Sequence, residues 1–223
     1  MTIQDIDERV QRLSDRIGLA CSLQIEQTDN SLDPAFVNKT NGHITLFVNV
    51  NKLETINIPI DDVLLHELYH VRQLTARYPI VVSAQPDRRM AAINNSVTDC
   101  CVTADMCETG YTDAAYTIFL SRVDALECRP PDVVSDDGMQ YRAAQLIAES
   151  SIWFREHRRR LQMILKERYG SIYHTANMMS SSYLEMIEME DRRNATASFL
   201  GVFLRQAGYR VVEMDEYMIA ERE

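Results

Sequence analysis

The stretch DDVLLHELYHVRQL, residues 61–74, places two histidines four positions apart, with a glutamate directly after the first. On an α-helix, residues i and i+4 lie on one face, with about 5–6 Å between their Cβ atoms. His66 and His70 could therefore bind one ion at the roughly 2.0–2.1 Å of a zinc–nitrogen bond. Glu67 is rotated by about 100° from His66. That position is poor for a third ligand but suits a general base acting on a water at the metal.

These residue types predict hydrolysis of an amide bond. Zinc lowers the pKa of a water that it binds to about 7, and a neighbouring carboxylate takes the proton as the water attacks a carbonyl carbon. The resulting carboxylic acid then protonates the leaving amine. The competing interpretation is a hydrogen-bonded structural pair of histidines that binds no metal. Uncharged neighbours favour a buried metal helix instead: Val63, Leu64, Leu65, Leu68, Tyr69 and Val71.

The segment VLLHELYHV, residues 63–71, resembles the zincin metallopeptidases through its H-E-x-x-H sequence. It departs from the longer family pattern at Arg72, where a hydrophobic residue is usual. The resemblance implies a zincin-like domain with zinc as cofactor and a peptide or protein as substrate. It also implies that an upstream edge strand binds extended peptide, and HITLFVNVN, residues 43–51, occupies the expected place of that strand.

A catalytic zinc ion needs a third protein ligand and an open position for water. The segment 70–80, HVRQLTARYPI, contains no further histidine after its first residue, which favours a downstream carboxylate. Asn95 and Asp99 are four positions apart, so a helix would place both on one face. Residues 95–111, NSVTDCCVTADMCETGY, resemble the N-x-x-x-D metal helix of a group of bacterial metallopeptidases. By that resemblance Asp99 is the third zinc ligand, and Asn95 supports the metal ligands without binding the metal itself.

A second carboxylate remains an alternative. The segment GYTDAAY, residues 110–116, is similar to the G-T-x-D-x-x-Y sequence of the aspzincins, which would make Asp113 the ligand. Its threonine is displaced by one position, and aspzincins place this sequence much closer to H-E-x-x-H. Asp99 is therefore the preferred candidate.

The elements that must position these residues begin with a predicted amphipathic helix at 3–17, where apolar residues recur every three to four positions. Residues 19–27 are predicted to be a strand, and the polar segment 28–42 is predicted to be a loop. Apolar and polar residues alternate in 43–51, as in a strand. After Pro59 a helix carries the histidines, and either Asp61 or Asp62 is expected to cap it.

The remainder is predicted to be almost entirely helical. We expect helices at about 87–108, 112–127, 140–168, 176–190 and 193–206, followed by a short strand in YRVVEM, residues 209–214. The Pro-Pro and Asp-Asp-Gly sequences of 129–140 suggest a boundary. The predicted fold is α+β and predominantly helical. Residues 1–130 would form a zincin-like metal-binding domain with a small sheet and an active-site helix, and 139–223 a helical C-terminal part of the same or a second domain.

Composition excludes several classes of function. The 223 residues carry a formal net charge of −10, which disfavours nucleic-acid binding. The one basic run, REHRRRLQ at 155–162, is interpreted as a solvated helix face. Neither a signal peptide nor a membrane span is evident, and the five cysteines form no C-x-x-C pair, so a cytoplasmic protein with reduced cysteines is expected. The predicted function is zinc-dependent peptide hydrolysis. The alternative is a metal-binding helical sensor or interaction module without proteolytic activity.

Overall fold

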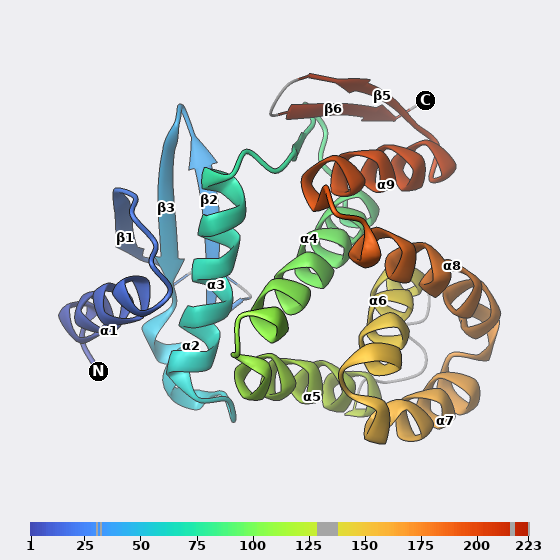
Figure 1. Ribbon diagram of the computed structural model, residues 1–223, viewed down its shortest axis with the longest axis horizontal. Coiled ribbons are helices and arrows are strands. Elements are labelled where there is room, and N and C mark those ends of the chain that lie inside the picture. Colours follow the sequence, from blue (N-terminus) through green and yellow to red (C-terminus); the bar gives the residue numbers. More distant parts are fainter. Residues whose placement is uncertain (30, 32, 129–137, 215–216, 223) are drawn as a thin grey trace. The chain divides into compact units, whose positions relative to one another are not determined.

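The computed structural model describes residues 1–29, 31, 33–128, 138–214 and 217–222. These residues form an α+β, predominantly helical fold with two three-stranded sheets, which confirms the predicted fold class (Figure 1). Among the described helices, none combines the length and apolar character needed to cross a membrane.

Two compact units make up the chain. The first contains Met1–Ala76 and Asp105–Ser121, and the second contains Arg77–Ala104 and Arg122–Glu223. Helices α4 (Arg88–Glu108) and α5 (Thr112–Cys128) each contribute residues to both units. The predicted boundary segment falls mainly on 129–137, outside the described residues, so the proposed division at 130 and 139 stays a prediction.

The first unit is a small sheet covered on one face by helices. Its elements before the shared helices are α1 (Ile3–Arg16), β1 (Leu23–Gln27), β2 (Ala35–Thr40), β3 (His43–Val48), α2 (Val50–Thr55) and α3 (Ile60–Thr75). The strand order is β1-β3-β2, with β1 parallel and β2 antiparallel to β3. Ile44, Leu46 and Val48 alternate along β3 and share one hydrophobic core with residues of α1 and α3. Figure 1 shows α3 lying beside β2.

Two sequence-based predictions for this sheet are wrong. Residues 35–40 were expected in a loop but form β2, which joins β3 through Asn41 and Gly42. These two residues have φ values of 52° and 79°, as in the type I′ turns that connect hairpin strands. The strand at His43–Val48 was expected at the edge of the sheet, but pairing on both sides makes it the central strand.

The second unit combines helices with a second sheet. Its further elements are β4 (Ile80–Val82), α6 (Met139–Ile152), a short 3-10 turn (Arg155–His157), α7 (Arg158–Arg168), α8 (Gly170–Glu188), α9 (Arg192–Gln206), β5 (Tyr209–Glu213) and β6 (Tyr217–Arg222). The strand order is β4-β6-β5. The single helix predicted for 140–168 is divided instead, because Phe154 leaves helical geometry at φ −119° and ψ 47° and buries its ring.

Candidate metal centre

Helix α3 carries both histidines, and its start is fixed by charge rather than by a side-chain cap. Pro59 is the N-cap residue and makes no capping hydrogen bond, so the prediction that Asp61 or Asp62 caps the helix is wrong. Both aspartates lie in the first turn, where negative charge favours a helix. Asp61 also accepts hydrogen bonds from Arg9 at 2.6 Å and from Arg12 at 2.9 Å. These ion pairs attach the start of α3 to α1.

The two faces of α3 have different surroundings. Leu64, Leu68 and Val71 belong to the core that also contains the buried residues of β3. His66 and His70 lie on the other side of the helix, because 100° per residue places them roughly 160° from Leu64 and Leu68, respectively. Packing against the sheet therefore holds α3 in place, and the face that carries His66 and His70 lies outside the sheet core.

The two imidazoles are neighbours. Their ring centroids are 4.9 Å apart and the rings are nearly perpendicular, at 87°. His66 is buried, with 6% of the residue exposed, and His70 is half-buried. Glu67 lies between them in sequence and is 9% exposed. Burial removes water that would otherwise compete for these groups, so a cation bound here would be held in a low-dielectric environment.

The end of α4 is anchored to α3 inside the first unit. The Tyr69 hydroxyl of α3 hydrogen-bonds to the Thr109 hydroxyl directly after α4, and its ring meets Tyr111 edge-on with centroids 6.1 Å apart. Arg72 lies over the Tyr69 ring at 5.8 Å. Burial raises the pKa of Tyr69, so the phenol stays neutral and keeps its hydroxyl hydrogen for such a bond.

Asp99, two turns before the end of α4, completes a group of three possible metal ligands. One ligand atom each from His66, His70 and Asp99 lies within 4.8 Å of the others. Tetrahedral zinc with bonds of about 2.0–2.1 Å requires ligand atoms about 3.4 Å apart. Two imidazole nitrogens and a carboxylate oxygen are also the donor types that zinc accepts.

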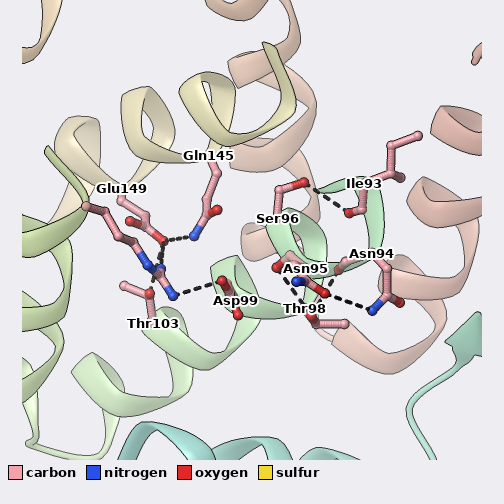
Figure 2. Close-up of polar contacts among 10 residues, drawn as sticks. Ile93, Asn94, Asn95, Ser96, Thr98, Asp99, Thr103, Gln145 and Glu149 are labelled. Carbon is pink, nitrogen blue, oxygen red and sulfur yellow. Dashed lines mark hydrogen bonds and ion pairs between the residues drawn. The ribbon is translucent and has the colours of Figure 1, made fainter. Parts of the chain in front are cut away.

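A second layer of charge lies behind Asp99. Arg122 of α5 donates from Nη2 to Asp99 Oδ2 at 2.8 Å, and its Nη1 lies 4.0 Å from Glu149 Oε1. Figure 2 shows Asp99 on α4 and Glu149 on α6. Arg122 connects the two carboxyl groups through one hydrogen bond and one longer ion pair. The ion pair between Arg122 and Asp99 restrains the Asp99 carboxylate, since a hydrogen bond between two charged groups is short and directional.

Glu149 is the most deeply buried charged side chain of this network, with 0% exposure. Its Oε1 accepts hydrogen bonds from Thr103 at 3.0 Å and Gln145 at 2.8 Å, and both bonds are drawn in Figure 2. Its Oε2 is buried without a hydrogen-bond partner among the described residues. Burial raises the pKa of Glu149 to about 7, although the positive charge of Arg122 and the two hydrogen bonds act to lower it. Glu149 is therefore poised between its neutral and charged forms near neutral pH.

The other predicted site residues lie elsewhere. Asn95 is exposed on α4, and its Oδ1 accepts a hydrogen bond from Asn94 at 3.4 Å (Figure 2), so its supporting role stays a prediction. Asp113 is exposed in the first turn of α5. Burial raises the pKa of Asp62, a hydrogen bond with Thr117 lowers it, and the charges of Asp61 and Asp113 raise it. The group that contains both histidines takes its carboxylate from Asp99.

Sequence reasoning missed Arg122, Glu149 and a buried glutamine on α3, Gln73. Glu149 did carry a signal, because AAQLIAESS, residues 143–151, places one charge in a run of small and apolar residues typical of a buried helix. Arg122 carried none, since an arginine in a mixed helix is usually exposed.

Comparison with known proteins yields no relative. No protein-family model matches the chain, and no curated protein or solved structure matches it.

Proposed function

We propose that the chain is a zinc-dependent metallopeptidase that hydrolyses peptide bonds. One observation carries this proposal: His66, His70 and Asp99, up to 33 positions apart in the sequence, bring their ligand atoms within 4.8 Å of one another. Two histidines one helical turn apart and one carboxylate form a three-ligand set, which leaves a fourth position for water or substrate.

Zinc held by these three side chains would supply Lewis acidity toward a water and a peptide carbonyl. Glu67 follows His66 on the buried part of α3, where a carboxylate accepts the proton of the attacking water. The protonated Glu67 then transfers this proton to the departing amine, and the peptide bond breaks. Arg122 keeps the Asp99 carboxylate oriented during this cycle.

A peptide substrate requires an extended surface beside the centre. Because β3 is central, the edge-strand role implied by the resemblance passes to β2, which ends the sheet among the described strands. β2 packs against the metal helix, and Lys39 on β2 donates to the Leu74 carbonyl of α3 at 3.5 Å. An extended peptide added to β2 would pair with main-chain groups, which is a common mode of peptide recognition.

The five cysteines support a reducing compartment, such as the cytoplasm, for this activity. Among the described residues, no disulfide joins Cys21, Cys100, Cys101, Cys107 or Cys128. Disulfides are rare in compartments that keep thiols reduced. Neither nucleic acid nor a membrane is part of the proposed activity.

The decisive experiment measures zinc content and hydrolysis together. We expect about one zinc per chain after dialysis against trace zinc, and cleavage of a fluorogenic peptide library. Glu67→Gln should retain the zinc and lose hydrolysis by roughly 10²-fold or more, because the base is removed while the ligands remain. Glu167→Gln, on the exposed face of α7, is the matched control and should leave both unchanged. Absence of zinc, or full activity of Glu67→Gln, would refute the proposal.

A second candidate is a metal-binding module that does not hydrolyse peptides. The burial of Glu67 at 9% exposure favours it, since a general base must be reached by water. This candidate predicts stoichiometric zinc in both the parent protein and Glu67→Gln, with no cleavage by either. The same experiment therefore separates the two functions.

A further inference from the structure

Gln73 on α3 is buried, with 4% exposure, and its amide nitrogen Nε2 is buried without a hydrogen-bond partner among the described residues. More than about 90% of buried polar groups in proteins have a partner. Leaving a buried donor unpaired costs about 1–3 kcal/mol, so such a group calls for an explanation. A donor reserved for a ligand is one explanation, and an ordered water is another.

The position of Gln73 on the helix points to a ligand at the metal face. At 100° and 1.5 Å per residue, Gln73 lies about 20° from His66 and about 60° from His70 around the axis, and about 4.5 Å beyond His70 along it. Leu68, which packs in the sheet core, lies about 140° away. The two histidines and the unpaired amide therefore occupy one narrow sector of α3.

Nearby tyrosines that could act as donors are already engaged. The Tyr69 hydroxyl bonds to Thr109, and the Tyr111 hydroxyl donates to the Arg16 carbonyl at 3.5 Å. Neither hydroxyl group is therefore available to donate a hydrogen bond to a substrate. Peptide hydrolysis needs such a donor, because the carbonyl oxygen gains negative charge as the water attacks its carbon. A neutral amide in a buried site stabilises that charge without adding a positive charge beside the metal ligands.

We propose that the Gln73 amide donates a hydrogen bond to the carbonyl oxygen of the scissile peptide as that oxygen becomes negative. This inference rests on the proposed peptidase function. Water supplies the new C–O bond and Glu67 accepts its proton. When the C–N bond breaks, the carbonyl double bond re-forms and Glu67 returns the proton to the amine. Gln73 exchanges no proton and acts as a catalytic residue through hydrogen bonding alone.

The test compares Gln73→Met with Gln206→Met, which changes an exposed glutamine on α9. Methionine matches the size of glutamine but has no donor. We expect kcat of Gln73→Met to fall by about 10²–10³-fold, as when an oxyanion donor is lost, with KM changed by less than about threefold. Zinc content should stay the same. Melting temperature should stay equal or rise, because an unpaired polar group has been removed from a buried position.

A kcat within about twofold of the parent would overturn the proposal and would assign the amide to packing or to a water. A lower melting temperature of Gln73→Met with an unchanged kcat would also overturn the proposal. If Gln73→Met does not fold, Gln73→Asn gives the test, because it retracts the donor by one methylene and should also lower kcat at constant KM. Failure of the proposed peptidase function is recognised from the zinc content and the hydrolysis rates of the parent and of Glu67→Gln. A parent protein without zinc or without hydrolysis overturns both proposals.

Discussion

Arg122 donates to Asp99 at 2.8 Å, so the carboxylate proposed as third metal ligand is already held by a guanidinium on a different helix. Both side chains are mostly buried, with 25% and 20% exposure. An ion pair in such a position resists solvent screening and restricts rotation of the carboxylate. Asp99 therefore depends on α5 for its direction and on α4 for its place.

Replacing Arg122 with methionine should weaken zinc binding by about 10–100-fold, since partners that orient metal ligands contribute this much to affinity. Competition with a chromophoric chelator measures the change, and circular dichroism verifies that the variant is folded. Arg160→Met is the matched control, because Arg160 pairs with Asp124 and Glu127 on the surface. Equal zinc affinities for the two variants would show that Arg122 does not position the ligand.

The choice between the two candidate ligands is testable by an exchange of one atom. Asp99→Asn should weaken zinc binding by more than about 100-fold, because losing a ligand exceeds the loss of its supporting partner. Asp113→Asn, at the exposed start of α5, should bind zinc like the parent. Titration with zinc followed by calorimetry gives both affinities. The reverse order of effects would make Asp113 the third ligand.

The helices were largely predictable because their signals are local. Helix α1 was predicted at 3–17 and observed at Ile3–Arg16, and α4 and α5 match their predictions within one residue at each end. Strand β2 was not predicted, because Asn38, Lys39 and Thr40 break the apolar alternation and the strand is held by its pairing with β3. Edge or central position is likewise a property of the partner strands and not of the segment itself.

The first layer of the candidate centre was predictable and the second was not. His66 and His70 share a helical face by spacing alone, and a short resemblance supplied Asp99. Arg122 and Glu149 lie 23 and 50 positions from Asp99, and their approach to it depends on how α5 and α6 pack. A sequence pattern contains no information on that packing unless a relative supplies it.

The central position of β3 predicts a large effect of core truncation. Leu46 is fully buried between two paired strands, so Leu46→Ala should lower the free energy of unfolding by about 3 kcal/mol. Thr45→Ala, on the half-buried opposite face, should change it by less than about 1 kcal/mol. Urea denaturation measures both. Similar losses in the two variants would contradict the assigned direction of the β3 side chains.

Glu149 predicts a pH dependence of stability in the zinc-free protein. Its folded-state pKa is raised from 4.5 to about 7, chiefly by burial. A raised carboxyl pKa means that the folded state binds the proton more tightly than the unfolded state. The stabilising contribution of Glu149 to the free energy of unfolding is fully present below about pH 4.5 and is lost as the pH rises to about 7. The groups that face Glu149 are Arg122 on α5, Asp99 and Cys100 on α4, and Gln145 on its own helix.

Glu149→Gln removes this titration while keeping the size of the side chain and an oxygen that can accept from Thr103 and Gln145. At pH 5 the variant and the parent should have similar free energies of unfolding. At pH 8 the variant should be more stable, by on the order of 2–3 kcal/mol, because the parent must then ionise a carboxyl group at 0% exposure. Urea titrations of both proteins at pH 5, 6, 7 and 8, with a chelator present, give the difference. A difference that stays constant across this range would mean that Glu149 keeps an ordinary pKa, and that Arg122 compensates its charge fully.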